Sequence, residues 1–427
     1  MGPRTKSSCG TKLGTPLLFR TSAAAGSPLQ EEESDPGAAN HRDERLPVQG
    51  KVREKADSVP SPFPVPGPPN IYSLSAIRPA IDSLSSPTRS HSRHPSAHVP
   101  PPPRPPPSAC PRAYPLATTR DRFVAFRRSL PRTPPLERQT VRTRGIAFAV
   151  FTTPPVDDPD ATPLLCVNGG MLYDHSMLWP ALSPLARTRQ VILYDQRGRG
   201  LSEAPSDTAN ASIEDDAADI GALRRALGVR RWDILGHSWG GGIALLAASL
   251  DEAGTRQLVT IDGVGPTSAW MTPLREAVSS RLTGPQRVDF DRLTDIDLEQ
   301  PDPEIQAAYS RAVYPAWFAD AEMAHTFTPP KVTSATGAVI LARLRRDGYD
   351  WRPRLRALSV STLVIHGEED ALPVSVSSEL VELLPRATRL LVPHAGHMPF
   401  WEAPDLLFPA VESFLAAPMP GSVRRSV

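Results

Sequence analysis

Residues 231–248 read Arg-Trp-Asp-Ile-Leu-Gly-His-Ser-Trp-Gly-Gly-Gly-Ile-Ala-Leu-Leu-Ala-Ala, and this stretch decides the fold. A short apolar strand, residues 232–235, runs into Gly-His-Ser-Trp-Gly, and a helix rich in alanine and leucine follows directly. G-x-S-x-G between a strand and a helix is the nucleophile elbow. The tight turn strains the serine backbone and leaves no room for side chains on its flanks. We therefore expect the hydroxyl of Ser238 to stand free at the top of a sheet, close to the N-terminal amides of the new helix.

Strands and helices alternate on both sides of the elbow. Apolar segments predict strands at 141–151 (a strand pair or one bent strand), 164–167, 190–194, 257–261, 361–365 and 388–392. Helices are predicted from the Ser212 cap to Gly228, over 374–384 and over 406–415. Residues 267–350 break the rhythm with helical pieces and no strand. The pattern predicts an α/β fold, in which helices flank a mostly parallel sheet that carries a helical cap.

The chain has 427 residues, and nearly half of its 50 prolines precede residue 120. That Pro/Ser/Arg-rich composition predicts a disordered arm over residues 1–120. One α/β domain is predicted over 121–420, with the cap insertion at about 267–350. Two alternatives for the arm stay open, namely a transit peptide and a translation start farther downstream.

The bulk properties exclude several classes of function. A net charge of +1 gives no reason to expect nucleic acid as a partner. Three cysteines provide no disulfide framework, and Cys166 is expected to be a small buried hydrophobe, which fits a reducing cytoplasm. No apolar run approaches the roughly 18 residues of a membrane helix. We expect a cytoplasmic protein that acts on a small molecule or a short peptide; its oligomeric state is not predictable.

A serine hydroxyl needs a base, and the base needs a carboxylate to orient it. In enzymes built on such an elbow, the acid and the base follow the serine in that order. Two later strand ends supply candidates: residues 366–373, His-Gly-Glu-Glu-Asp-Ala-Leu-Pro, and residues 393–400, Pro-His-Ala-Gly-His-Met-Pro-Phe. We assign Asp370 as the acid, with Glu368 or Glu369 as alternatives. We assign His397, which follows a glycine in a loop, as the base; His394 competes for that role.

The oxyanion of acyl transfer needs two amide donors. One is expected from Trp239, the residue after the nucleophile, and the other from Gly170, with Met171 as its possible replacement. The pair His394 and His397 has metal-ligand spacing, but no third ligand is in view. We predict neither a metal nor a cofactor.

Two loops add a family resemblance. Residues 195–202 read Asp-Gln-Arg-Gly-Arg-Gly-Leu-Ser, and residues 168–172 read Asn-Gly-Gly-Met-Leu. Over about residues 140–415 the chain resembles the α/β-hydrolase superfamily, and within it the proline iminopeptidase-like (AB hydrolase-1) group. That group carries Asp-Gln-Arg-Gly-x-Gly-x-Ser and His-Gly-Gly-Pro-Gly, so the first loop is intact here. The second has lost its histidine, which Asn168 replaces, and its proline. By the resemblance, Ser238, Asp370 and His397 fall on the positions of a catalytic triad.

The resemblance implies a cofactor-independent serine hydrolase that cleaves an ester, a lactone or an amide. A prolyl aminopeptidase is the alternative, although the Trp-Glu pair common in the caps of that group is absent here. The nearest acids in the cap, Asp320 and Glu322, are expected only to start a helix. A catalytically silent binding protein on the same scaffold is a third possibility. The substrate pocket is expected to use apolar cap and loop side chains, chiefly Met171, Trp270, Tyr314, Trp317 and Phe318, with Met271 and Tyr309 as further candidates.

Overall fold

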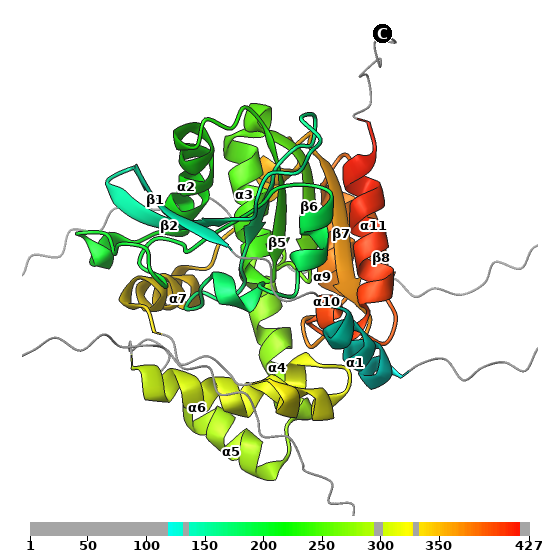
Figure 1. The fold of residues 1–427 in the computed structure, drawn as a ribbon. Helices are drawn as coiled ribbons and strands as arrows, with labels where there is room; N and C mark the ends of the chain where they lie inside the picture. Colours follow the sequence, from blue (N-terminus) through cyan, green and yellow to red (C-terminus); the bar gives the residue numbers. More distant parts are fainter. Residues whose placement is uncertain (1–117, 131–135, 294–301, 328–332, 419–427) are drawn as a thin grey trace, which may run out of the picture. The chain divides into compact units, whose positions relative to one another are not determined.

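A computed structural model describes residues 118–130, 136–293, 302–327 and 333–418 (Figure 1). The arm predicted for residues 1–120 lies outside the described residues up to residue 117.

A sheet of eight strands forms the centre of the described part, in the order β1-β2-β4-β3-β5-β6-β7-β8. The pairs β1–β2 and β2–β4 are antiparallel, and all later pairs are parallel. This confirms the predicted α/β-hydrolase type of sheet. The strands are β1 (Glu137–Thr143), β2 (Ile146–Thr152), β3 (Leu164–Val167), β4 (Val191–Tyr194), β5 (Trp232–His237), β6 (Thr255–Ile261), β7 (Ser361–Gly367) and β8 (Ala387–Val392).

The segment predicted as a strand pair or a bent strand is a pair, β1 and β2, joined at Arg144 and Gly145 with φ of 49° and 74°. The hairpin starts earlier than residue 141, the first residue of the predicted segment. β1 lies at the sheet edge, and only its Val141 is buried. Its first half therefore has no apolar alternation from which a strand could be recognised.

Helices cover both faces of the sheet, as predicted. α2 (Ile213–Ala226), α3 (Trp239–Leu250) and α9 (Ser375–Leu383) pack on one face, where they bury Leu165 and Val167 of β3. α1 (Thr119–Ser129), α10 (Pro399–Glu402) and α11 (Pro404–Ala416) pack on the other, against Leu164 and Cys166. This alternation is that of a strand buried on both sides. Burial raises the pKa of the Cys166 thiol, as expected for a small buried hydrophobe.

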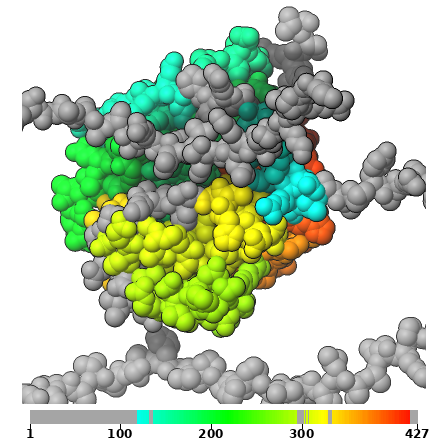
Figure 2. All heavy atoms as spheres, turned by 60° about the horizontal axis from the view of Figure 1, so that its bottom comes forward, coloured from blue at the N-terminus to red at the C-terminus, as the bar shows by residue number. Residues whose placement is uncertain are grey.

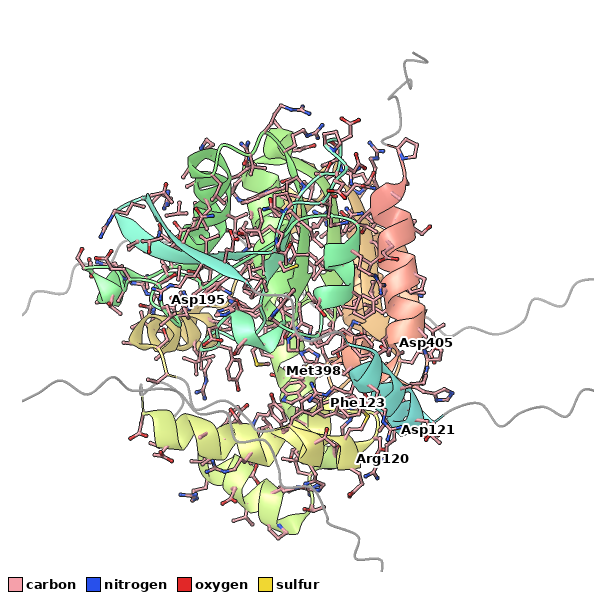
Figure 3. The ribbon with its side chains drawn as sticks, in the orientation of Figure 1. Arg120, Asp121, Phe123, Asp195, Met398 and Asp405 are labelled. Carbon is pink, nitrogen blue, oxygen red and sulfur yellow. The ribbon has the colours of Figure 1, made fainter. Side chains whose placement is uncertain are left out.

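The first helix, α1, was not predicted. Its Thr118 cap accepts from the Asp121 amide, and the Asp121 side chain accepts from the Thr118 amide. Only Phe123 and Phe126 of the helix are buried, and their rings pack against Trp401. Figure 3 labels Phe123 on this helix and Met398 on the loop after β8. A helix with so few apolar residues depends on tertiary contacts, so its periodicity is weak in the sequence.

The region predicted as a cap lies between β6 and β7. Its described residues form helices and no strand; the ends meet in an isolated bridge between Thr267 and Asp350. Figure 1 shows these helices, yellow-green to gold, beside one end of the sheet, and Figure 2 shows the yellow-green and yellow part as spheres. They are α4 (Met271–Arg281), α5 (Gly284–Leu293), α6 (Pro303–Val313), η7 (Tyr314–Trp317), η8 (Ala321–Thr326) and α7 (Ala335–Asp347). Over the described ranges, no helix is long and apolar enough to cross a membrane.

Candidate active site

The elbow has the strain that the sequence predicts. Ser238 has φ 53° and ψ −122°, in a region that residues with a side chain rarely adopt. A Cβ on Gly236 would lie 2.3 Å from the carbonyl oxygen of Gly240, and one on Gly240 would lie 2.3 Å from that of Val167. The two glycines are therefore steric requirements. The Ser238 amide donates to Ile261 O at 2.9 Å, which ties the turn to the neighbouring strand.

Three side chains from three strand ends, those of Ser238, His397 and Asp370, are joined by two hydrogen bonds. We call this set of three residues the relay. The Ser238 hydroxyl lies 2.9 Å from Nε2 of His397, and Nδ1 of His397 lies 2.8 Å from Oδ2 of Asp370. Oδ1 of Asp370 accepts from the Leu372 amide at 3.0 Å. Burial raises the pKa of Asp370, but the charge and hydrogen bond of His397 outweigh burial, so that pKa lies below its usual value. The carboxylate stays ionised and orients the imidazole so that Nε2 faces the serine.

The competing acid and base candidates lie elsewhere. His394 is exposed, and its Nδ1 lies 3.3 Å from Oε1 of Glu369 rather than near Ser238. Glu368 is exposed as well. Among the candidates for the two roles, Asp370 is the acid that contacts His397, and His397 is the histidine that contacts Ser238.

The glycine loop after β3 approaches Ser238 closely. A Cβ on Gly169 would lie 2.8 Å from Cβ of Ser238, and Gly170 turns the chain with φ 70°. Trp239 is the first residue of α3, so its amide belongs to the turn whose N–H groups have no partner within the helix. The loop carrying Gly170 and Met171 therefore lies beside the amide of Trp239. The choice of Gly170 over Met171 as the second donor stays a prediction.

Residue 168, where the group has histidine, holds this loop from inside. The Asn168 side chain donates to Gly169 O at 3.3 Å and to Tyr173 O at 3.0 Å. The backbone carbonyl oxygen of Asn168 accepts from Nε2 of Gln196 at 3.1 Å. The asparagine side chain therefore holds the backbone of the loop by bonding to its start at Gly169 and to its far end at Tyr173.

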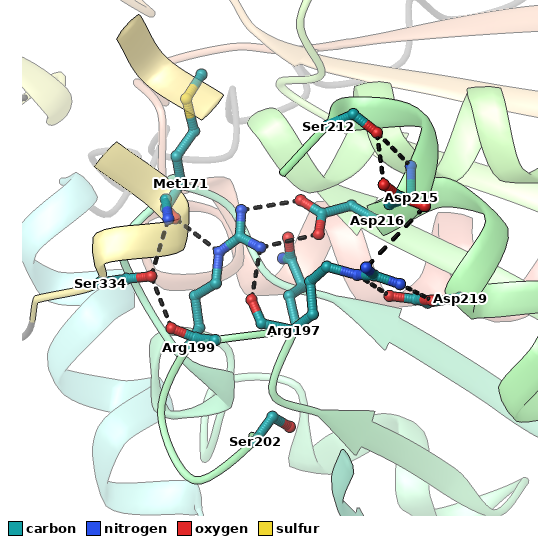
Figure 4. A network of polar contacts seen from close by, with 12 residues as sticks. Met171, Arg197, Arg199, Ser202, Ser212, Asp215, Asp216, Asp219 and Ser334 are labelled. Carbon is teal, nitrogen blue, oxygen red and sulfur yellow. Dashed lines mark hydrogen bonds and ion pairs between the residues drawn. The ribbon is translucent and has the colours of Figure 1, made fainter. Parts of the chain in front are cut away.

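The intact motif at 195–202 supports the same loop (Figure 4). Arg199 is buried, makes two 2.8 Å contacts with the Asp216 carboxylate, and donates from Nε to Met171 O at 2.9 Å. Arg197 makes two 2.6 Å contacts with Asp219. Burial raises the pKa of Asp219 to about 6 despite this arginine. The motif thus anchors the loop of residues 168–172 to α2, and its side chains lie outside the contacts among Ser238, His397 and Asp370.

Two buried residues beside the relay were missed in the sequence. The His237 ring donates from Nε2 to His397 O at 2.8 Å, and burial, with the nearby His397, lowers its pKa to about 3. Asp262, with φ 47°, accepts from the Gly367 amide at 2.8 Å. Burial, followed by the charge of Asp370, raises the pKa of Asp262 well above its usual value. His237 therefore stays uncharged at neutral pH, and burial favours the neutral form of Asp262. The only sequence signal for Asp262 is its place directly after a buried strand.

Several His and Asp side chains lie close enough to consider a metal. In each of three groups, the ligand atoms lie within 4.8 Å of one another. Two of the groups include a member of the relay. In the third, Asp195 already accepts from the His175 ring and amide and from the Leu201 amide. The groups are His237, Asp262 and His397; Asp262, His366 and Asp370; and Asp174, His175 and Asp195.

A cavity of about 710 Å³ opens above Ser238, between the sheet domain and the cap. Four of the five predicted pocket residues line it, namely Met171, Trp270, Tyr314 and Trp317, as do Met271 and Tyr309. The prediction for Phe318 is wrong. Phe318 is not among the described lining residues; its buried ring packs 5.2 Å from the Phe327 ring, in the core cluster that also holds Phe400 and Trp401.

The comparisons agree with this architecture. A family model described as alpha/beta hydrolase fold matches residues 162–404. The 2-hydroxymuconate semialdehyde hydrolase of Pseudomonas putida is 31% identical over 279 residues, which is 64% of this chain and 94% of that protein. A proline iminopeptidase of Lactobacillus delbrueckii subsp. lactis is 28% identical over 262 residues, 56% of this chain and 85% of that protein.

Among solved structures, the enol-lactonase of Burkholderia xenovorans LB400 superposes with a TM-score of 0.50 at 21% identity, over 65% of this chain and all of that one. At that identity the match supports the fold alone. With the elbow, the sheet order and the family match together, the chain belongs to the α/β-hydrolase superfamily, and the proline iminopeptidase-like group that its loops resemble is among its relatives.

Proposed function

We propose that this chain is a serine hydrolase that cleaves an ester, a lactone or an amide through an acyl-enzyme. One observation carries the proposal: the chain of contacts Ser238–His397–Asp370, at 2.9 and 2.8 Å, lies beneath a cavity large enough for a small organic substrate. The relay has the contacts that a serine nucleophile needs, since its base is within hydrogen-bond reach and is itself oriented.

In the first half of the reaction, Oγ of Ser238 attacks the carbonyl carbon while Nε2 of His397 takes the hydroxyl proton. The carbonyl oxygen gains the electron pair, and the amides of Trp239 and Gly170 stabilise its charge. When the tetrahedral intermediate collapses, His397 gives the proton to the leaving oxygen or nitrogen. Asp370 keeps the imidazole in its tautomer and stabilises the imidazolium.

In the second half, water replaces the leaving group. His397 takes a proton from the water as the water oxygen attacks the acyl carbon of the Ser238 ester. Collapse of the second intermediate releases the carboxylic acid and returns the proton to Oγ. The cycle balances without a cofactor.

The cavity lining combines apolar side chains with three arginines, Arg275, Arg345 and Arg346. Around Ser238 its walls are apolar or aromatic, with Met171, Trp270 and Trp317 among them. Among the described lining residues, the only carboxylate is that of Asp347, which is exposed and contacts Arg346 at 2.7 Å. The described lining therefore gives a free amine few carboxylates to bind, and its apolar side chains favour an aliphatic or aromatic acyl chain.

An aminopeptidase is the second candidate, because the relatives include proline iminopeptidases and the loop at 195–202 matches that group. It requires an acid that holds the substrate amine. Asp320 caps η8 by accepting from the Glu322 amide at 3.0 Å, and Glu322 is exposed. Neither is among the described residues that line the cavity. We therefore rank the ester, lactone or amide hydrolase above the aminopeptidase as the proposed function.

Labelling with a fluorophosphonate probe tests the serine mechanism. We expect the probe to label the wild type and to leave Ser238→Ala unlabelled, since it phosphonylates only an activated serine. Ser268→Ala is a matched control, because Ser268 also lines the cavity but lies outside the relay, and it should label like the wild type. Failure of the wild type to label would instead favour a catalytically silent binding protein.

A substrate comparison then separates the two enzymes. We expect p-nitrophenyl esters or lactones with short to medium acyl chains to turn over faster than a proline anilide. Turnover of the proline anilide alone would reverse the order of the two candidates.

A further inference from the structure

One short stretch of the cap, residues 316–319, contacts both loops that carry the acid and the base. The His397 amide donates to Trp317 O at 2.7 Å, and the Trp317 ring lies 4.6 Å from the His397 ring. A Cβ on Gly396 would lie 2.6 Å from Trp317 O and 2.8 Å from the Ala319 amide nitrogen. The base therefore receives its backbone and ring contacts from the cap as well as from the sheet domain.

Glu402 fastens the base loop to this stretch. The side chain of Glu402 is fully buried in α10. Its Oε1 accepts from the Ala319 amide at 2.7 Å, and its Oε2 accepts from the amides of Gly396 and Met398 at 2.9 and 3.2 Å. The two oxygens of one carboxylate thus hold the cap and both neighbours of His397 at a fixed separation. Burying a carboxylate costs free energy even when amides solvate it, so this is a poor way to gain stability alone.

Arg281 fastens the acid loop to the same stretch. It is the last residue of α4, and its guanidinium donates to Ala316 O at 3.2 Å, to Glu369 O at 2.7 Å and to Asp370 O at 2.8 Å. The planar guanidinium has several donors in a rigid array, which suits it to bridging carbonyls of separate segments. The acid is therefore tied to the cap through its own backbone.

We propose that Glu402 and Arg281 are positioning residues, which use residues 316–319 as a common support so that the placement of the cap sets the distances between Ser238, His397 and Asp370. This inference rests on the proposed serine hydrolase function. Neither residue touches the reacting atoms. Each acts through the backbone of a loop that carries a member of the relay, so a cap shift at residues 316–319 moves the base and the acid together.

The expected size of the effect follows from the tolerance of the chemistry. A displacement of about 1 Å in a reacting group can cost about 100-fold in rate. In Glu402→Gln the side chain keeps its volume, but its amide group must face one of the three N–H donors and repels it. We therefore expect the rate of Ser238 phosphonylation by the probe to fall by about 10- to 100-fold.

The experiment uses the full chain in three measurements: the rate constant of fluorophosphonate labelling, kcat and KM for a p-nitrophenyl ester, and hydrogen exchange of the amides of Ala319, Gly396 and Met398. Glu402→Gln should lower the labelling rate and kcat, leave KM within about threefold, and speed exchange at the three amides. Asp405→Asn, an exposed acid two residues into the next helix, is the matched control and should match the wild type.

Arg281→Gln guards against a variant that fails to fold, because Arg281 is exposed. It should lower kcat in the same direction, whereas Arg292→Gln on the exposed surface of the cap should not. Faster exchange with an unchanged labelling rate would overturn the inference, since the contacts would then be structural only. Unchanged exchange and labelling would overturn it too. A wild type that the probe does not label would overturn the proposed function, and the inference with it.

Discussion

Replacing Asp370 by asparagine tests which of two buried acids orients the base. Asp370 uses both oxygens: Oδ2 accepts from Nδ1 of His397 at 2.8 Å, and Oδ1 accepts from the Leu372 amide at 3.0 Å. An asparagine has only one accepting oxygen. If that oxygen stays on the Leu372 amide, the NH₂ group faces Nδ1, and His397 must move its proton to Nε2, where it can no longer accept from Ser238.

The opposite orientation points the NH₂ group at the Leu372 amide and leaves a buried donor unpaired, at a cost of about 1–3 kcal/mol. The inactive tautomer is therefore the favoured outcome. The comparable change in a serine protease triad lowers kcat by about 10⁴-fold, and we expect a loss of that order in Asp370→Asn.

Asp262 gives the matched comparison, because it is equally buried and lies beside Asp370. Its Oδ1 accepts from the Gly367 amide at 2.8 Å, and burial raises its pKa well above the usual value. Asparagine has the same shape as Asp262 and keeps an acceptor for the Gly367 amide, so kcat should change by less than about 10-fold in Asp262→Asn.

The assay is the pre-steady-state release of p-nitrophenol together with the steady-state rate, for the wild type and both variants. Far-UV circular dichroism checks that each variant is folded. Equal losses in the two variants would refute the assignment of Asp370 as the sole orienting acid. A loss confined to Asp262→Asn would transfer the role to Asp262.

Three further results are expected. Gly169→Ala should lower kcat/KM by about 100-fold in a steady-state assay, because the new Cβ would lie 2.8 Å from His237 O and push the oxyanion loop away; Gly284→Ala, with no atom within 4 Å, should have no effect. Arg199→Met should lower the free energy of unfolding by about 3–5 kcal/mol in urea titrations, since it leaves the Asp216 carboxylate buried and unpaired; an unchanged midpoint would contradict the proposed anchoring of the loop. Burial raises the pKa of Glu402 from 4.5 to about 7, so its contribution to stability is present below the lower value and is lost as the pH rises through the upper one. The stability difference between the wild type and Glu402→Gln should therefore favour the wild type more at about pH 5 than at about pH 8, and the opposite trend in urea midpoints would show that the carboxyl is not buried.

Local signals account for the parts of the site that the sequence predicted. The strain at Ser238 arises because a strand and a helix follow one another with only a tight turn between them. It can therefore be predicted from the eighteen consecutive residues 231–248. The same holds for the Ser212 cap of α2, whose hydroxyl accepts from the Asp215 amide. Such features depend on neighbours in the chain, and no distant contact has to be known to infer them.

Contacts between distant segments account for the misses. α1 packs against Trp401, far along the chain, and the buried Phe318 ring packs against Phe327 instead of lining the cavity. Glu402 lies only five residues after His397, yet nothing local marks it as a support for the base; its role emerges only when Ala319 is seen beside it.

The sequence alone determined the fold class, and it predicted the candidate nucleophile and the order in which the candidate acid and base follow it, because each is a local pattern or an order of elements along the chain. The tertiary structure decided which of the neighbouring candidates contact one another: Asp370 rather than Glu368 or Glu369, and His397 rather than His394. The reason is geometric. Residues one to three positions apart in a loop point in different directions, and only the packing of the sheet ends and the cap selects the one that faces the serine.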